Sequence, residues 1–451
     1  MSIVERYYYK ISNYSEKNAI FVDGKYFSYS DLKLAIDNER DNLINKGVDH
    51  GEIVFLVGDY SIRAISLFLA LALNKNIVVP ITTEIEDELN QRSNVLSPDW
   101  IINIRNNTFE RNLCSPDLVH HKLVDSIKNK AVSGLVLFSS GSTGTPKAMI
   151  HDLDNLISVY LDRKTKSLNF LVFLMFDHIG GINTLLNCLS MGSTITIPTH
   201  RNPDHICELI ETTKINILPA SPTFLNLMII GRSYAKFDLS SLIMITYGTE
   251  TMPGSLLDKL KQVFPKVKFL QTFGTSETGI AKTTSLSSTS TFVKIDDPDQ
   301  EYKVVEGELW LKSKTQIMGY INHSNESFTS DGWFKTGDLV QEGENGFIKI
   351  IGRTKEVINV GGEKVMPAEV ESVILELPWV QDCVVKGKPN IISGQMVTLQ
   401  VCINDNIDPI VAKSEIRKHC QTRLEAYKVP AKVSIVESVD VSSRFKKIRN
   451  K

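Results

Sequence analysis

The residues best suited to chemistry lie in one short segment, residues 139–147 (SSGSTGTPK), directly after the apolar run 135–138. Small residues let backbone N–H groups approach phosphate oxygens, hydroxyls add further donors, and Lys147 adds a positive charge. The segment is not a Walker A loop, because Pro146 precedes the lysine and no Gly-Lys-Ser/Thr sequence follows. Surface loops share this composition, but the buried run before it and the Pro-Lys ending favour a phosphate-binding loop. Its members are Ser139, Ser140, Gly141, Ser142, Thr143, Gly144, Thr145, Pro146 and Lys147.

Regular elements must hold this loop in place. Between residues 130 and 280, short apolar runs alternate with amphipathic segments of helical length, which is typical of buried strands joined by crossover helices. The expected strands are 135–138, 171–176, 194–197, 215–218, 242–246 and 268–270. We therefore predict an α/β fold.

The last hundred residues are predicted to form a separate small domain. A strand at 347–351 is followed by a polar connector at 352–356 and by a helix that begins at Pro367, a residue favoured at the first helical position. An apolar stripe then recurs at helical spacing up to Pro378. We place the N-terminal domain at residues 1–353 and the small domain at 354–451.

Composition restricts the function classes. The 451 residues carry 50 Lys and Arg against 52 Asp and Glu, a net charge of −2, which argues against nucleic-acid or anionic-membrane binding through bulk charge. The six cysteines contain no C-x-x-C pair, so they predict buried reduced thiols rather than a zinc site. No apolar run approaches the ~20 residues that span a bilayer, and we expect no membrane insertion and a cytoplasmic location.

Six segments, in order along nearly the whole chain, resemble those of the adenylate-forming superfamily, which includes acyl- and aryl-CoA ligases, luciferases and adenylation domains. They are residues 27–32 (FSYSDL), 139–147, 273–277 (FGTSE), 307–309 with 318–320, 333–338 (WFKTGD) and 352–371. The resemblance implies a large N-terminal adenylate-forming domain with α/β subdomains and a small, mobile α+β C-terminal domain.

The same resemblance implies that the protein binds ATP and Mg²⁺. Glu277, with the hydroxyl of Thr143, takes the place of the residues beside the metal, since a hard cation that bridges phosphate oxygens prefers oxygen ligands. Asp338 would accept hydrogen bonds from both ribose hydroxyls, and Arg353 would add donors near the ribose and phosphate. The other nucleotide-binding candidates are Gly248, Thr249 and Glu250 on one side of the adenine, Phe273 and Gly274 on the other, and the hydroxyl of Ser276.

The family's last motif is Gly-Lys-Ile, whose lysine reaches the carboxylate and the α-phosphate during adenylation. Here the tail reads Arg444-Phe445-Lys446-Lys447-Ile448, with a lysine where the glycine should be. Lys447 aligns with the family's lysine and is assigned as catalytic, and Lys446 could substitute for it. A frayed basic tail is the structural alternative.

The segment 175–181 (MFDHIGG) supplies the candidate residues for binding the acid. His178 with Gly181 fits the ligase pattern, in which the histidine lies beside the acyl pocket and belongs to the catalytic set. Phe176-Asp177 also fits the amino-acid-activating pattern, because a buried carboxylate needs a cation or donors; alternatively, Asp177 caps the following helix. The predicted pocket residues are Phe176, Asp177, Thr223, Tyr247 and Thr272.

The glycine pair Gly361-Gly362 resembles the segment that lines the pantetheine tunnel of acyl-CoA ligases; a turn would also explain the two glycines. The predicted reaction is ATP-dependent activation of a small carboxylic acid to an acyl-adenylate, followed by a rotation of the small domain about Lys355 and transfer to a thiol, most simply CoA. Two alternatives stay open: an enzyme that adenylates an amino acid or acyl group and loads the phosphopantetheine of an acyl carrier protein, and a degenerate nucleotide-binding homologue.

Overall fold

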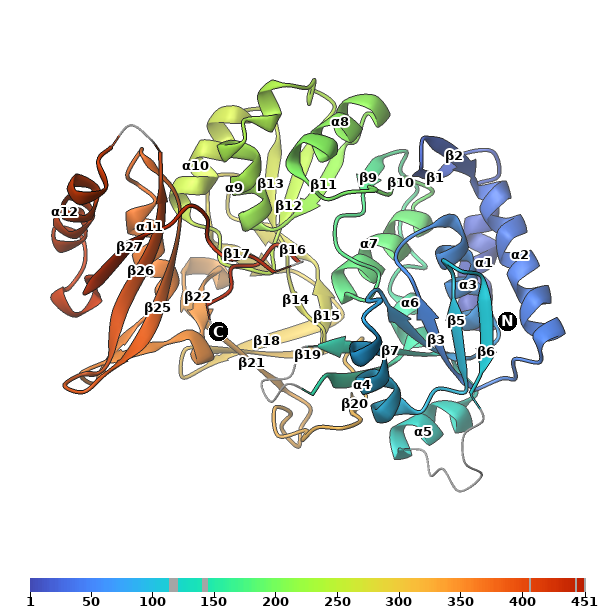
Figure 1. Cartoon of the computed structure of the whole chain (residues 1–451). Coiled ribbons are helices and arrows are strands. Elements are labelled where there is room, and N and C mark those ends of the chain that lie inside the picture. The colour runs from blue at the N-terminus through green and yellow to red at the C-terminus, as the bar shows by residue number, and fades with distance from the viewer. Residues whose placement is uncertain (113–120, 140–144, 405–406, 443, 450–451) are drawn as a thin grey trace.

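Two seven-stranded sheets with a layer of helices between them make up most of the N-terminal part of the chain (Figure 1). The computed structural model describes residues 1–112, 121–139, 145–404, 407–442 and 444–449. The first sheet is parallel apart from its edge strand β2 and has the order β13 (Lys268–Gln271), β12 (Met244–Tyr247), β11 (Ile217–Ala220), β9 (Asn169–Leu171), β10 (Thr194–Thr196), β1 (Asn18–Val22) and β2 (Lys25–Ser28).

The second sheet carries the start of the loop predicted to bind phosphate. Its order is β20 (Gly319–Tyr320), β8 (Lys147–Asp152), β7 (Gly134–Ser139), β4 (Ile77–Ile81), β3 (Ile53–Val57), β5 (Trp100–Asn103) and β6 (Thr108–Arg111). Strands β7 and β8 pair antiparallel with Ser139 opposite Lys147, so the two ends of the loop are fixed side by side.

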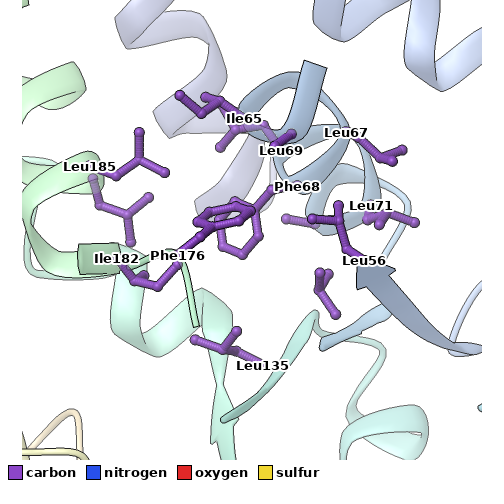
Figure 2. Close-up of a cluster of buried hydrophobic side chains, with 14 of the residues drawn as sticks. Leu56, Ile65, Leu67, Phe68, Leu69, Leu71, Leu135, Phe176, Ile182 and Leu185 are labelled. Carbon is purple, nitrogen blue, oxygen red and sulfur yellow. The ribbon is translucent and has the colours of Figure 1, made fainter. Parts of the chain in front are cut away.

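Helices cover both faces of these sheets. The shared core lies between the sheets, where Phe68 and Phe176 meet with ring centroids 5.5 Å apart (Figure 2). The helices of the N-terminal part are α1 (Ile3–Ser12), α2 (Tyr29–Lys46), α3 (Ile62–Leu73), α4 (Glu86–Leu96), α5 (Lys122–Lys130), α6 (Leu153–Ser158), α7 (Ile179–Ser190), α8 (Pro203–Thr213), α9 (Pro222–Ile230) and α10 (Gly254–Val263).

A third, antiparallel sheet follows and leads to the small domain. Its order is β16 (Thr283–Ser285), β17 (Val293–Ile295), β22 (Ile348–Arg353), β21 (Phe334–Glu342), β19 (Glu308–Ser313) and β18 (Gln300–Val305), and the hairpin β14 (Phe273–Thr275) with β15 (Gly279–Ala281) precedes it.

The small domain is a five-stranded sheet with two helices on one face. Val370 and Ile374 of α11 and Ile416 of α12 pack on this face and close a separate hydrophobic core. The elements are β23 (Ile358–Val360), β24 (Glu363–Val365), α11 (Pro367–Ile374), β25 (Val380–Asn390), β26 (Gly394–Ile403), α12 (Pro409–Gln421) and β27 (Lys432–Ile435). The α/β class and the large-plus-small arrangement are therefore confirmed, whereas the boundary at 353/354 stays a prediction; it falls between β22 and β23.

One expected strand is shorter in the structure. The apolar run 171–176 predicts a strand, but β9 ends at Leu171, whose ladder partner is Thr196. Beyond that residue the chain turns towards α7, and Phe176 packs in the core between the sheets. A run of apolar residues indicates that a segment is buried, and a buried loop satisfies that pattern as well as a strand does. Within the described residues, no helix combines the length and the apolar character needed to cross a bilayer.

Candidate active site

A cavity of about 140 Å³ lies where β12 and β13 end. The carboxyl ends of neighbouring parallel strands meet at one edge of a sheet, which is where α/β proteins place ligands. Two short segments from these ends form its walls, residues 248–251 after β12 and 271–274 around the end of β13. The rest of the lining comes from β21, β22 and the residues after them and from the C-terminal tail: Asp338, Ile350, Gly352, Arg353, Glu356, Lys446, Lys447 and Arg449. The nucleotide candidates Gly248, Thr249, Glu250, Phe273, Gly274, Asp338 and Arg353 are therefore brought together.

The wall after β12 is built for close backbone approach. A Cβ on Gly248 would lie 2.7 Å from Thr272 Oγ1 and 2.8 Å from the Thr272 carbonyl oxygen. Thr249 follows with φ of 70°, in the left-handed region. Because the backbone of one wall lies against that of the other, a side chain at position 248 would push them apart and change the edge of the cavity that both segments line.

Asp338 and Arg353 form the polar floor of this cavity. They are direct partners in the antiparallel register of β21 and β22, and Arg353 Nε donates to Asp338 Oδ1 at 3.0 Å. Asp338 is only 5% exposed, and burial raises the pKa of its carboxyl while the Arg353 guanidinium opposes that shift. Asp338 Oδ2 has no hydrogen-bond donor among the described residues, so a sugar hydroxyl can reach it.

Lys147, Tyr320 and Glu277 form a second polar group beside the start of β8. Tyr320 donates its hydroxyl to Glu277 Oε1 at 2.8 Å, and the Lys147 ammonium lies 5.9 Å from the Tyr320 ring centre. Lys147 also hydrogen-bonds His323. Burial, with repulsion from Lys355, lowers the pKa of Lys147.

The residues present fit a magnesium ion that is held largely by phosphate oxygens. Glu277 offers a carboxylate with one oxygen already oriented by Tyr320. In the described part of the chain, no cluster of three His, Cys, Asp or Glu side chains could hold a metal alone, and Mg²⁺ bound through one or two carboxylates plus substrate phosphates needs none. Ser139 and Ser276 belong to described segments, but Ser140, Gly141, Ser142, Thr143 and Gly144 lie outside them.

A second cavity, of about 200 Å³, adjoins the first and shares residues 248–249 and 272–274 with it. Its far side is lined by apolar Phe170, Leu174 and Ile217 together with polar Asn183 and Asn187. None of the residues that line it carries a formal charge, because its single titratable member is a neutral histidine. This cavity is the candidate acid pocket.

The histidine of the acid pocket is His178, which caps α7. Its Nδ1 accepts from the Gly180 N–H at 3.0 Å. Burial, reinforced by the charges of Arg444 and Lys446, lowers its pKa to about 3. The ring is therefore neutral at physiological pH, with Nδ1 unprotonated and Nε2 carrying the hydrogen.

Four of the five predicted pocket residues do not line the acid cavity; Thr272 alone does. Phe176 is fully buried between Tyr60 and Phe68 in the core between the sheets (Figure 2). Tyr247 is 1% exposed and belongs to the core on the other face of the first sheet. Successive side chains of a strand point to opposite faces. The sequence therefore predicts which segments lie near the cavity but not which of their side chains face it.

The other two pocket candidates bind neighbouring residues instead. Thr223 donates to Glu250 Oε2 at 2.6 Å, beside a smaller cavity of about 30 Å³. Asp177 neither caps α7 nor lines the acid pocket; its Oδ2 accepts from Arg444 of the C-terminal tail at 3.3 Å. The cation that a buried carboxylate needs thus comes from the protein itself.

The assignment of Lys447 as the lysine that reaches the substrate stays a prediction; in this structure Lys447 directs its ammonium away from the nucleotide cavity. Its Nζ lies 2.8 Å from Asp382 Oδ1 and donates to the Cys383 carbonyl at 2.7 Å, so it points into the small domain. Lys446 and Lys447 both line the nucleotide cavity, but only the Lys446 ammonium has no hydrogen-bond or ion-pair partner among the described residues. The alternative that the sequence left open is the one that the geometry favours, because neighbouring side chains of an extended tail point in opposite directions.

Gly361 and Gly362 form the turn between β23 and β24, with φ of 61° and 95°. No atom lies within 4 Å of a Cβ built on either residue. Their glycine identity is explained here by the turn conformation, since both φ values disfavour other residues. In this arrangement of the domains they line neither cavity.

Sequence reasoning missed Tyr320, His323 and Asp382. Tyr320 belongs to a matched segment and could have been found there, since a hydroxyl beside a metal-associated carboxylate orients it. His323 and Asp382 carry no local signal; their contacts with the two lysines join residues 176 and 65 positions apart in the chain.

The fold and the two adjoining cavities define a nucleotide-binding enzyme of the adenylate-forming class. Two family models match the chain, the AMP-binding enzyme over residues 125–321 and the AMP-binding enzyme C-terminal domain over 369–446. The chain belongs to the AMP-binding enzyme family and is similar to its acyl-CoA ligases.

Curated relatives include a 4-coumarate–CoA ligase-like protein from Arabidopsis thaliana, 28% identical over 71% of this chain. The aligned part spans 62% of that relative's length. A 2-succinylbenzoate–CoA ligase from Listeria monocytogenes is 25% identical over 97% of this chain and 96% of its own.

Solved structures share the fold across the whole length. The anthranilate CoA ligase AuaEII in complex with anthranoyl-AMP superposes with a TM-score of 0.82 at 19% identity, covering 99% of this chain and 95% of its own. The o-succinylbenzoate coenzyme A synthetase from Bacillus subtilis, solved with ATP and magnesium, gives a TM-score of 0.78 at 19% identity, covering 99% and 98%.

Proposed function

We propose that the protein is an acid–CoA ligase that activates a small carboxylic acid with ATP and passes the acyl group to CoA. The observation that supports this most is the shared wall of the two cavities, residues 248–249 and 272–274. A nucleotide on one side of that wall and an acid on the other would meet at its edge. The named activities of the relatives agree with this reaction.

The first step joins the two substrates. A carboxylate oxygen attacks the α-phosphorus of ATP, a P–O bond forms, and the bond to the departing pyrophosphate breaks. Asp338 would fix the ribose, and the backbone walls would fix the adenine, so most of the rate gain is positioning. Mg²⁺, when bound near Glu277, supplies charge neutralisation for the phosphates.

The second step needs a thiol. The sulfur attacks the acyl carbonyl, a C–S bond forms, the C–O bond to AMP breaks, and the thiol proton leaves to solvent. The domain boundary at 353/354 and a rotation about Lys355 are part of the proposal. They are supported by the position of Lys355 in the short connector between β22 and β23 and by the separate core of the small domain.

The acid pocket favours an uncharged body on the acid over an amino acid. An ammonium group would need a carboxylate in the cavity, and no Asp or Glu is among the residues that line it; Asp177 lies outside it and pairs through Oδ2 with Arg444. Loading of a carrier protein by an amino-acid adenylase is therefore the less favoured function. A cytoplasmic location also stays a prediction, consistent with the free thiols of the described cysteines.

The test is ATP–pyrophosphate exchange with separate pools of aryl acids, short and medium fatty acids, hydroxy acids and amino acids. Exchange with an uncharged acid, followed by a CoA thioester when CoA is added, is the expected result. Exchange with amino acids alone, abolished by Asp177→Ala, would favour the carrier-loading enzyme. ATP binding without exchange for any pool would favour a degenerate nucleotide-binding homologue.

A further inference from the structure

The C-terminal tail, residues 444–449, runs between the small domain and the N-terminal part and contacts both. In Figure 1 it is the red segment that leaves the small domain and crosses towards the centre of the molecule. Arg444 pairs with Asp177 on one side, and Arg449 Nη2 lies 2.9 Å from Glu371 on the other. The tail is thus fixed at both ends.

Contacts of Phe445 and Lys447 fix the register of the residues in between. The ring of Phe445 packs against Phe173 and Phe224, each with centroids 5.3 Å away, and its carbonyl accepts from Ser221 Oγ at 2.8 Å. The N–H of Lys447 donates to Glu250 Oε1 at 2.7 Å. A slip of one residue would expel the aromatic ring from its site, so the directions of the two lysines are set.

Lys447 is committed to the small domain. Its side chain is 9% exposed and its partner Asp382 is 6% exposed, and the ammonium donates to the Cys383 carbonyl as well. Burial alone would lower its pKa, but the carboxylates of Asp382 and Glu371 outweigh burial and raise it. Moving this ammonium to a substrate would leave the buried Asp382 with the Cys383 N–H as a donor but without a cation, which is costly.

Lys446 has the opposite surroundings. Like Lys447 it lines the nucleotide cavity, beside Asp338 and Arg353, but no described residue forms a hydrogen bond or ion pair with its ammonium. Burial and repulsion from Arg353 lower its pKa. Its charge also acts on His178 of the acid pocket. Lys446 therefore lines the nucleotide cavity with an unpartnered ammonium, close enough to the acid pocket for its charge to act on His178.

We propose that Lys446, and not the lysine that aligns with the family's motif, is the catalytic residue that contacts the carboxylate and the α-phosphate during adenylation. Lys447 is a positioning residue that ties the tail to Asp382. The proposal rests on the proposed function, because it assigns a role within that reaction. In this assignment the catalytic lysine occupies the position where the family's motif has its glycine, which explains why that glycine is missing here.

The sharpest test is Lys446→Gly, which restores the family's Gly-Lys-Ile sequence. If Lys447 were the adenylation lysine, exchange would persist or improve. We expect exchange to fall by about 100-fold or more, the usual effect of removing one donor to the transition-state charge. Lys446→Ala should match it, and Lys446→Arg should recover part of the loss; retained exchange in Lys446→Gly would overturn the proposal.

Lys447→Met is the matched control for the neighbouring lysine. We expect it to lower the melting temperature and to reduce exchange far less than Lys446→Gly. Adding Asp382→Asn should restore part of the melting temperature, because no unpaired buried charge remains. A loss of exchange in Lys447→Met as large as that in Lys446→Gly, at unchanged melting temperature, would count against the assignment.

A labelling experiment locates the lysine without relying on turnover. Benzoyl-adenylate is a mixed anhydride, and a nearby amine attacks its carbonyl, so that an amide C–N bond forms, the C–O bond to AMP breaks and the amine proton is lost. Mass spectrometry of the full chain should find the benzoyl group on Lys446, suppressed by excess AMP. Labelling of Lys447, or of neither tail lysine, would overturn the proposal, whereas absent exchange in the unaltered protein would count against the proposed function.

Discussion

The two sides of the candidate active site are built differently. The nucleotide side is made of backbone, from residues 248–249 and 273–274, plus the cross-strand pair Asp338–Arg353. The acid side shares residues 248–249 and 273–274 and adds side chains from a loop, from α7 and from the strands β9, β11, β12 and β15. Backbone walls depend on local motifs, whereas side-chain walls depend on which way each residue points. The first kind of site can be predicted from a sequence residue by residue, and the second cannot.

Among the tests of this difference, Phe176→Ala is expected to have the largest effect. Phe176 belongs to the predicted acid pocket by sequence but is fully buried beside Phe68 (Figure 2). Truncating a buried aromatic costs about 3–5 kcal/mol of stability, so urea should unfold the variant at a much lower concentration. Phe170→Leu, in the wall of the acid cavity, should instead change the KM of the acid. An altered acid preference without destabilisation in Phe176→Ala would return this residue to the pocket.

Asp338→Asn tests the nucleotide side. The change removes the charge that faces Arg353 and one acceptor for a ribose hydroxyl. A hydrogen bond to a charged group contributes about 1.5–3 kcal/mol, so the Kd for ATP, measured by calorimetry, should rise about 10- to 100-fold. The exposed Glu342 ends the same strand, and Glu342→Gln should bind ATP like the unaltered protein. Equal ATP affinity in the two variants would remove Asp338 from the site.

The residues changed in these two tests show which parts of the site could be predicted from the sequence. Glu277, Asp338 and the segments after β12 and β13 were located because each lies in a motif whose spacing sets its place on a strand or turn. Phe176 and Tyr247 do not line the acid cavity, and the Lys447 ammonium points away from the nucleotide cavity. A run of apolar residues or two adjacent lysines gives no sign of which side chain faces a cavity. Asp177 could not be resolved because its partner, Arg444, is 267 residues further along the chain.

Gly248→Ala tests whether the shared wall depends on backbone contact. Its Cβ would meet the Thr272 carbonyl at 2.8 Å, and such overpacking costs about 1–3 kcal/mol. Exchange should decrease because the wall shifts against both cavities. Gly254→Ala is the matched control, since nothing lies within 4 Å of its Cβ and alanine favours the first turn of α10. Similar behaviour of the two variants, by melting temperature and exchange, would show that the wall tolerates a side chain.

The smallest expected effect is on the pH dependence of folding stability, to which His178 of the acid pocket contributes. Burial lowers the pKa of His178 to about 3 and that of His151 to about 4, from an ordinary value of 6.5. Below pH 6.5 the unfolded chain binds protons that the folded chain excludes, so stability falls with pH down to those values, by at most about 1.4 kcal/mol per pH unit for each group. In His178→Asn the amide oxygen can still cap α7 while its share of the pH dependence is lost.

Urea midpoints measured from pH 7 to pH 4.5 should therefore fall less steeply for His178→Asn than for the unaltered protein, with His151 among the groups that supply the remaining slope. An unchanged slope in His178→Asn would mean that the ring takes up a proton in the folded state. The acid cavity would then carry a positive charge, and it would recognise acids with a second carboxylate, contrary to the uncharged pocket on which the proposed acid class depends.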